Sequence, residues 1–424
     1  MYLSTKILYN FIKELDTGMY ITTGQGGNLP LIKEQNKFLI REVIYKFSPV
    51  SRIQIAESLA LTPSTITTNV NELLQQKLIR ECLNDGTVNE NRILGRHPVK
   101  LEYNPEAKYF TGIDIGPYST TFILTDMVGK VVSRLKGPAQ SGPYQQLIPY
   151  LADNIHKLME KGAVKTDKIM GTGIGVPASV DDNNAAILMS SRSDWSGKPM
   201  AADMSVKTGL GTVIENNVKA RITAADLFNR NLKADIFLYY RISSGMSCPM
   251  VIRKNMLGTR VIGSSEIGHM LALRSDKSPK QEPILLHYAA SEQAICGQCE
   301  RAIRNGKARI LSRLCSVPGK PSIDEVLDAQ KAGDKDADAI MATAIMHLSL
   351  NLVNLINFVR PEGVLVEAFI MTLPKNKNYM LEIINRNLYS YESNAPAIEF
   401  VPYNEYIGAL GGAAVAIKHF LLEG

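Results

Sequence analysis

The sequence has little that would place it in a membrane or outside the cell. It contains five cysteines among 424 residues, and they are unevenly spaced. This usage fits a reducing cytoplasm better than a disulfide framework. No apolar run reaches about 18 residues, so we expect no membrane span. Acids appear early at the N-terminus and no small-residue cleavage site follows, so we expect no secretory leader.

The charge is also modest. Lys and Arg outnumber Asp and Glu by 47 to 41, a formal net charge of +6. Such a charge permits a nucleic-acid partner without arguing for one. Hydrophobic residues make up 45% of the chain. A chain of this length and composition can build two or three domains, each with a core of its own.

Residues 109–126 have the pattern of a hairpin with an acid and a glycine near its tip. Apolar residues alternate before and after the turn at Gly116-Pro117, and Asp114 stands two residues before the glycine. A glycine lets the backbone approach a bound phosphate, and an acid beside it can hold a metal or a water. An ordinary hairpin with an aspartate at its turn is the alternative interpretation.

The same pattern recurs in residues 235–254, where two strand-like runs flank the turn Ser243-Ser244-Gly245. Two glycine-tipped hairpins, well separated in the chain, suggest two similar lobes that face each other across a cleft. This plan resembles that of the actin-like sugar kinases. In that resemblance Asp114 and Gly116 belong to the first phosphate hairpin, and Ser244 and Gly245 to the second.

The first hundred residues predict a DNA-binding domain. Residues 1–28 form an N-terminal extension with an amphipathic helix. A short helix is expected over residues 52–59 with Ile53, Ile55 and Ala56 inward. Thr62 caps a second helix that has Pro63 at its first position. Polar side chains on the outward face of this second helix can donate to phosphates and reach base edges in a major groove. They are Ser64, Thr65, Thr67, Thr68 and Asn69.

A wing is expected after the second helix. Its tip would be the Gly-Arg-His-Pro stretch, which can place Arg96 in a narrow minor groove. Residues 1–110 carry 13 Lys and Arg against 11 Asp and Glu. A patch with so small a charge excess needs a dimer to bring two copies to one duplex. A helical hairpin with a polar exposed face is the alternative interpretation.

Several motifs in order carry a more specific resemblance. The sequence reads GRHPVKLEYN, GIDIG, GIGVPASVD, IENNVKA and EIGHM from residue 95 onward. It resembles the ROK family (repressors, open reading frames, kinases), and within it the xylose-repressor-like branch of transcriptional regulators. The resemblance implies an α/β chain: a winged helix-turn-helix at residues 29–104, then a two-lobed actin-like domain at residues 105–424 that binds sugars. Dimers or tetramers are implied as well.

The resemblance also indicates that phosphotransfer has been lost. Asn217 stands where ROK kinases have the aspartate that accepts the proton of the sugar hydroxyl, and an amide cannot serve as a general base. It can still hydrogen-bond a sugar, and Asn216 matches a sugar-contacting asparagine. Pro117 removes an N–H near the phosphate hairpin. Glu367 stands in a segment where relatives have glycines that admit adenine. We therefore expect no ATP cofactor and no catalytic residue.

Glu266 and His269 belong to an intact EIGH motif that contacts sugar hydroxyls in relatives, and we expect them to bind the effector. A solvated helix turn is the alternative interpretation. In relatives the histidine also binds zinc with three cysteines, but those thiolates are missing here, so we expect no metal. Cys296 and Cys299 have C-x-x-C spacing within a helix-like run, and two half-buried thiols are the favoured interpretation.

Arg192 lies in a segment where relatives have an asparagine that contacts the ligand. An arginine in a pocket favours an anionic or phosphorylated ligand. The sequence therefore predicts a cytoplasmic DNA-binding regulator of carbohydrate metabolism, preferably a repressor. Its partners would be double-stranded operator DNA, a small carbohydrate-like effector and a second copy, as a homodimer or homotetramer. The alternatives are a ROK sugar kinase with residual ATP-dependent activity, or a scaffold that binds neither ligand nor DNA.

Overall fold

The computed structural model describes residues 29–82, 99–228 apart from 182, 184 and 191, 236–252, 255–257, 265–273, 283–389 and 395–424. The chain divides into two compact units. Unit 1 comprises Met1–Asn231 and Gly408–Gly424, and unit 2 comprises Leu232–Ile407. The expected helix in residues 1–18 and the wing tip with Arg96 lie outside the described residues.

Unit 1 begins with a winged helix-turn-helix. Its elements are α2 (Leu29–Phe47), β1 (Val50–Ser51), α3 (Arg52–Leu59), α4 (Pro63–Gln75), β2 (Ile79–Cys82) and β3 (Lys100–Tyr103). The three short strands form one antiparallel sheet in the order β1-β3-β2.

Local sequence signals explain how α3 and α4 begin. Ser51 and Gln54 form a capping box at the start of α3. Thr62 accepts a hydrogen bond from the Thr65 amide at the start of α4, with Pro63 at the first helical position, as predicted. The expectation that Ile53 points inward is wrong. Its side chain is 61% exposed, because the inward face of this short helix runs through other residues, Ile55 among them.

The remainder of unit 1 is built on a five-stranded sheet in the order β10-β7-β4-β5-β6. The strands are β4 (Tyr109–Ile115), β5 (Ser119–Asp126), β6 (Val131–Pro138), β7 (Ile169–Val176) and β10 (Thr212–Asn216). The predicted first hairpin is confirmed, since β4 and β5 pair antiparallel from Tyr109 with Asp126 to Ile115 with Thr120. Strand β7 pairs in parallel with β4, and β10 pairs in parallel with β7. A small ribbon of β8 (Ala178–Val180) and β9 (Ile187–Ser190) leads to η2 (Ser193–Trp195).

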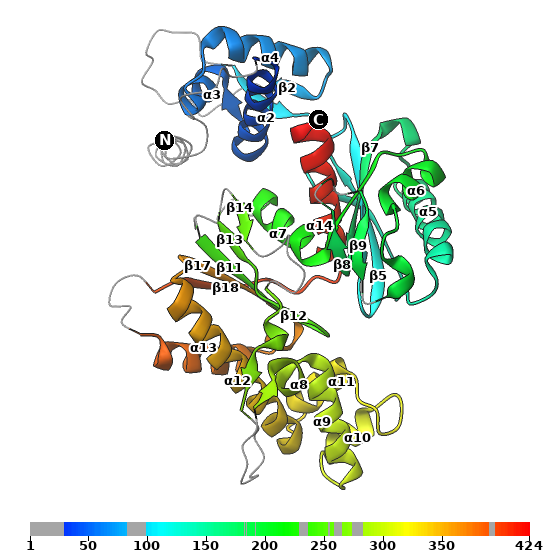
Figure 1. Cartoon of the computed structure of the whole chain (residues 1–424), viewed down its shortest axis with the longest axis vertical. Helices are drawn as coiled ribbons and strands as arrows, with labels where there is room; N and C mark the ends of the chain where they lie inside the picture. The colour runs from blue at the N-terminus through cyan, green and yellow to red at the C-terminus, as the bar shows by residue number, and fades with distance from the viewer. Residues whose placement is uncertain are drawn as a thin grey trace. The chain divides into compact units, whose positions relative to one another are not determined.

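Helices cover both faces of this sheet (Figure 1). On one face lie α5 (Tyr144–Lys161) and α6 (Met200–Thr208), and on the other lie α7 (Asn217–Phe228) and α14 (Ile407–Ala416). Helix α14 touches the sheet backbone, because a Cβ added at Gly112 would lie 2.1 Å from the Ala409 carbonyl oxygen. The final glycine-rich segment therefore packs on the sheet through its small residues.

The winged helix and the rest of unit 1 share one hydrophobic cluster. Ile40 and Ile44 of α2 belong to the same buried cluster as Phe110 of β4, Ala224 of α7 and Leu421. Leu421 lies in the C-terminal π-helix Ile417–Glu423, which continues α14. A shared core of this kind holds the winged helix against the lobe directly rather than through a free linker.

Unit 2 contains a second sheet, in the order β14-β13-β11-β17-β18, with β12 paired to β11. The strands are β11 (Ile236–Ile242), β12 (Met246–Ser247), β13 (Met250–Ile252), β14 (Asn255–Leu257), β17 (Gly363–Ala368) and β18 (Ala397–Phe400). The predicted second hairpin is confirmed, since β11 pairs antiparallel with both β12 and β13.

Helices provide most of the core of unit 2. They are α8 (Leu286–Ala290), α9 (Glu292–Arg304), α10 (Arg309–Leu314), α11 (Ile323–Lys331), α12 (Lys335–Val359) and α13 (Pro374–Asn387). The described part of the chain has one helix long and apolar enough to cross a membrane, α12, with a mean hydropathy of 1.7. Residues along α12, from Ala337 to Ile356, are buried in the core of unit 2.

Candidate functional site

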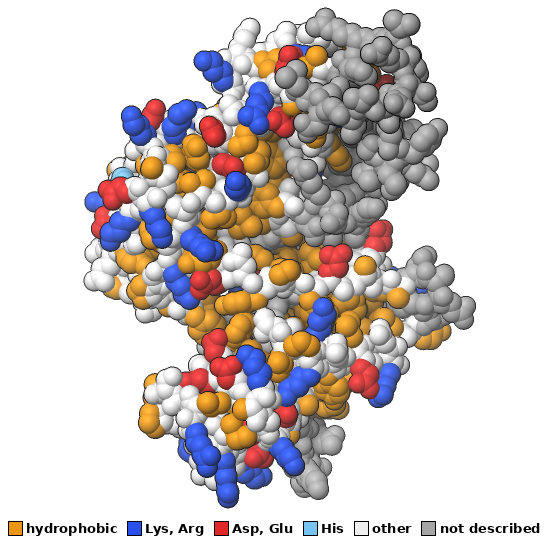
Figure 2. Space-filling model, turned by 180° about the vertical axis from the view of Figure 1, so that it is seen from behind, with side chains coloured by type: hydrophobic (Ala, Val, Ile, Leu, Met, Phe, Trp, Pro, Cys, Tyr) orange, Lys and Arg blue, Asp and Glu red, His pale blue; other side chains and the backbone are white. Residues whose placement is uncertain are grey.

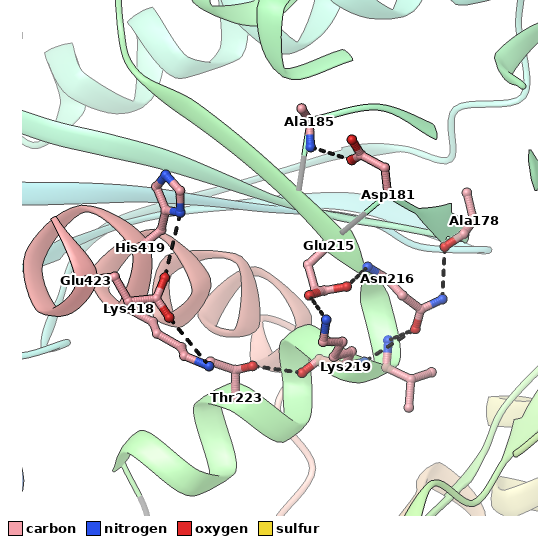
Figure 3. Close-up of polar contacts among 11 residues, drawn as sticks. Ala178, Asp181, Ala185, Glu215, Asn216, Lys219, Thr223, Lys418, His419 and Glu423 are labelled. Carbon is pink, nitrogen blue, oxygen red and sulfur yellow. Dashed lines mark hydrogen bonds and ion pairs between the residues drawn. The ribbon is translucent and has the colours of Figure 1, made fainter. Parts of the chain in front are cut away.

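Glu215 and Asn216 lie at the junction between β10 and α7 (Figure 3). Asn216 donates its amide to the Ala178 carbonyl at 3.0 Å, and its side-chain oxygen accepts from the amide of Val218, also at 3.0 Å. Asn216 thereby caps α7 and ties it to β8. Its predicted role as an effector contact stays a prediction, and the structure adds this positioning role.

Glu215 secures the same junction. Its carboxylate accepts from the Asn216 amide at 2.8 Å and pairs with Lys219 at 2.5 Å. The side chain is 7% exposed. A buried carboxylate that is matched by a lysine one turn ahead is well compensated, so the start of α7 is firmly held.

Asp114 does not stand open beside the phosphate hairpin. Its carboxylate accepts from both terminal nitrogens of Arg221, at 2.7 and 3.3 Å, and both side chains are 6% exposed. Gly408 lies against the pair, since a Cβ added there would come within 2.0 Å of Asp114. The guanidinium occupies the position that a cation bound to this carboxylate would take. The residues present therefore do not fit a metal-nucleotide at Asp114.

Asn217 lies close to this ion pair. It is the first residue of α7 and is buried, and Arg221 also donates to its main-chain carbonyl at 3.0 Å. Gly175 of β7 lies close to both Asp114 and Asn217. A Cβ added at Gly175 would be 3.3 Å from Asp114 Oδ1 and 3.5 Å from the Asn217 Cα. The structure thus brings together two of the residues that the sequence singled out, and Arg221 contacts both.

Arg221 is the residue that the sequence reading missed. It follows Asn217 by one helical turn and lies among small and apolar residues in VKARITAADLF. A single arginine on an otherwise buried helix face is a signal for a buried carboxylate partner, because unpaired buried charge is costly. That signal was present, but only the fold identifies Asp114 as the partner.

Arg192 stacks over Trp195, with its guanidinium carbon 4.4 Å from the ring centroid. Its Nη1 and the indole nitrogen of Trp195 are shielded from solvent and have no hydrogen-bond partner among the described residues. Burial lowers the pKa of Arg192, and Asp194 acts in the opposite direction. Two adjacent donors without acceptors can serve an anionic ligand.

Unit 2 holds the second turn and the EIGH motif. The turn that contains Ser244 and Gly245 is closed by a hydrogen bond from the Ser243 amide to the Gly245 carbonyl at 2.9 Å. Glu266 immediately precedes η3 (Ile267–His269), and His269 is its last residue. Glu266 Oε2 lies 3.4 Å from His269 Nε2. Their side chains are 53% and 74% exposed, so both can meet a ligand.

The segment around Glu367 in unit 2 makes several side-chain contacts. Glu367 of β17 accepts from the Tyr239 hydroxyl at 2.5 Å and pairs with Arg241 at 3.4 Å. Phe369 packs against Tyr403, with ring centroids 4.6 Å apart. That these side chains exclude adenine stays a prediction.

The cysteines of α9 behave as packing residues. Cys299 is buried and Cys296 is partly buried, and burial raises the pKa of each thiol to about 12. Thiols held in the neutral form are poor metal ligands. Within the described residues, His, Cys, Asp and Glu form no group of three that could hold a metal ion.

The outward face of α4 carries the predicted DNA contacts. Thr67 and Thr68 are exposed, and their hydroxyls donate to the carbonyls of Pro63 and Ser64 at 2.8 and 3.0 Å. These are local bonds, and a phosphate oxygen can replace the carbonyl as acceptor. The other described members of the predicted set are Ser64, which is exposed, and Thr65 and Asn69, which are partly buried.

The surface charge is mixed. Lys and Arg side chains are interspersed with Asp and Glu over the face drawn in Figure 2. In the winged helix, Arg52 pairs with Glu81 and Arg80 with Glu102. Neutralised cations contribute little to long-range attraction for a duplex, which agrees with the small net charge of residues 1–110.

The fold and these sites define a winged helix-turn-helix fused to a two-lobed α/β domain of the actin-like type. The ROK family model matches residues 110–419. The chain belongs to the ROK family.

The curated relatives match along almost the whole chain. The xylose repressor of Bacillus subtilis (strain 168) is 26% identical over 394 residues, covering 92% of this chain and 97% of the relative. The DNA-binding transcriptional dual regulator NagC of Escherichia coli (strain K12) is 21% identical over 413 residues, covering 94% and 96%.

Solved structures support the same fold. A ROK family transcriptional regulator, a homolog of the E. coli MLC protein, aligns with a TM-score of 0.75 at 22% identity, covering 92% of this chain and 97% of that one. A ROK family glucokinase from Streptomyces griseus, solved with glucose and AMPPNP, aligns with a TM-score of 0.60 at 18% identity. This alignment covers 72% of this chain and 98% of the glucokinase chain.

Proposed function

We propose that this protein is a DNA-binding transcriptional regulator of carbohydrate metabolism, with a repressor favoured over an activator. Its kinase-like domain binds a sugar-like effector without transferring phosphate. The observation that carries the proposal is the Asp114–Arg221 ion pair. It fills the cation position of a kinase-like lobe in a chain whose winged helix packs on that same lobe.

The loss of phosphotransfer rests on three independent positions. Asp114 is bound by Arg221, Asn217 offers an amide where a base is needed, and Glu367 is held by Tyr239 and Arg241. A general base must accept a proton, which an amide at neutral pH does not do. ATP and zinc are therefore no part of the proposed function. In this proposal the effector shifts the population between two conformations of the protein. The shift can be no larger than the difference in the effector's affinity for the two conformations.

DNA binding is tested by fluorescence anisotropy with the duplex upstream of the gene itself, using a homodimer or homotetramer verified by analytical ultracentrifugation. Thr67→Glu places a carboxylate on the outward face of α4 and should weaken the complex by more than about tenfold through repulsion from phosphate.

The matched control for this experiment is Thr343→Glu. Its hydroxyl makes the same local bond, to a carbonyl four residues earlier, but in α12 of unit 2. Duplex affinity that is equal in wild type and Thr67→Glu would contradict the proposed DNA face. Brisk ATP-dependent phosphorylation of a sugar would instead support the kinase alternative.

The effector class follows from Arg192. Its unpartnered Nη1 beside the Trp195 indole favours a sugar acid or sugar phosphate. Calorimetry should show sugar acids or phosphates displacing neutral sugars, and Arg192→Ala should remove that preference. Neutral sugars that outcompete their phosphates on the wild-type protein would contradict it. The uneven cysteines and their neutral thiols fit the proposed cytoplasmic location.

A further inference from the structure

Helix α7 runs from the predicted effector site to the DNA-binding domain. Its first residue is Asn217, and Asp226 lies in its last turn. Between these ends, Arg221 and Ala220 contact other elements of unit 1. The helix therefore touches the site, the sheet, α14 and the winged helix within 12 residues.

The first turn of α7 is fixed to the sheet. Arg221 joins Asp114 of β4 to the Asn217 carbonyl, and Asn216 ties the helix start to β8. A ligand that hydrogen-bonds Asn217 acts on this turn directly. Any displacement must be taken up by the whole helix, because one turn of an α-helix is hydrogen-bonded to the next.

The middle of α7 packs on α14 without intervening side chains. A Cβ added at Gly411 would lie 2.7 Å from the Ala220 carbonyl carbon and 2.9 Å from the Arg221 amide nitrogen. Backbone in such close contact leaves no space for α7 to move toward α14.

The last turn of α7 meets the winged helix. Ala224 and Leu227 share a buried cluster with Ile40, Val43 and other residues of α2. At the edge of this contact, Lys46 of α2 pairs with Asp226 at 3.2 Å.

Lys46 is shared between the two helices. It also pairs with Glu42 of α2 at 2.9 Å, and its side chain is 18% exposed. Burial alone would lower the pKa of Lys46, but Glu42 and Asp226 together raise it. The ammonium therefore stays charged and bridges α2 to α7.

Other contacts keep the winged helix from swinging freely. Arg41 donates to the Gly424 carbonyl, and the Met127 amide donates to the Pro105 carbonyl in the short connection from β3 to β4. A signal from the site must therefore pass through packed elements. Helix α7 has the required contacts at both ends.

We propose that α7 transmits effector binding at Asn217 to the DNA-binding domain, and that the Lys46–Asp226 pair is the joint between them. This inference rests on the proposed function. Asp226 touches neither the predicted effector contacts nor the outward face of α4. Its role is to couple the two sites, which is separable from binding at either one.

The test compares two variants that each remove one carboxylate from a lysine of α2. Asp226→Asn breaks the pair that crosses to α7, whereas Glu34→Gln breaks the Lys37–Glu34 pair within α2. Each is titrated with the upstream duplex, with and without the probes xylose, N-acetylglucosamine and their phosphates. Asp226→Glu serves as the conservative rescue.

We expect all the variants to bind the duplex within about twofold of wild type when no probe is present. Lys46 keeps its pair with Glu42 in Asp226→Asn, and the Lys37–Glu34 pair is partly exposed and contributes little. The probe-dependent change in affinity should fall at least about threefold in Asp226→Asn and persist in Glu34→Gln and Asp226→Glu. A full response in Asp226→Asn would overturn the inference. A wild-type protein that ignores the duplex would instead overturn the proposed function.

A second measurement needs no ligand. Hydrogen exchange is compared in the full chain between wild type and Asn216→Ala, which removes the side-chain bonds to Ala178 and Val218 at the start of α7. We expect faster exchange in α7 and also in the second half of α2, with α12 of unit 2 unchanged. Exchange that changes in α7 but not in α2 would also overturn the inference.

Discussion

Two acid-containing motifs of the ROK family differ in the burial of their side chains between unit 1 and unit 2. In unit 1, Asp114 is almost fully buried and bound by Arg221. In unit 2, Glu266 and His269 are more than half exposed and face each other at 3.4 Å. The difference teaches that motif survival in sequence does not define function, because the buried aspartate is committed to the fold and the exposed pair is available to a ligand.

The largest expected effect comes from breaking the buried pair. Arg221→Ala leaves Asp114 buried without a partner and should destabilise unit 1 by about 3–5 kcal/mol. Urea unfolding, followed by hydrogen exchange in β4, measures the loss. Arg52→Ala is the control, because its pair with Glu81 is partly exposed and should contribute less than about 1 kcal/mol. Equal losses in the two variants would remove the distinction.

The open pair should behave in the opposite way. His269→Ala and Glu266→Gln should abolish effector binding measured by calorimetry, because both groups are proposed ligand contacts. Stability should stay within about 0.5 kcal/mol of wild type, as is usual for exposed residues. Arg304→Ala removes another exposed ion pair, with Glu300, and should alter neither quantity. A marked fall in melting temperature without loss of binding would show that the pair is structural.

The smallest effect is expected at Asn217. Asn217→Asp introduces a carboxylate where the resemblance implies the aspartate of ROK kinases, but Arg221 still holds Asp114. ATP-dependent phosphorylation of a sugar panel should therefore remain at the background of the wild-type protein. Turnover above that background would mean that Asp114 remains accessible to a metal-nucleotide despite its ion pair with Arg221.

The fold was largely predictable because its signals are local. Thr62 and Pro63 mark the start of α4, and the turns at Gly116 and Gly245 mark the two hairpins. The order of motifs then identified the family. Ile53 was misplaced because a short helix gives the hydrophobic periodicity too few residues to define its inward face.

The candidate site was predictable only in part, since its decisive contacts are tertiary. Asp114 and Arg221 are 107 residues apart, and Lys46 and Asp226 are 180 apart. Spacing within a helix cannot reveal such partners. The same is true of the core that the winged helix shares with unit 1, because each contributing segment already has an amphipathic pattern that ordinary packing would explain.

Hydrogen exchange of the full chain tests the contrast between the two motifs most directly, with xylose and N-acetylglucosamine, their phosphates, and Mg-ATP added in separate experiments. We predict that at least one sugar or sugar phosphate protects the residues around Glu266 and His269. We predict that Mg-ATP leaves the β4–β5 hairpin unchanged. Protection of that hairpin by Mg-ATP, with none near His269 from any sugar, would contradict the account.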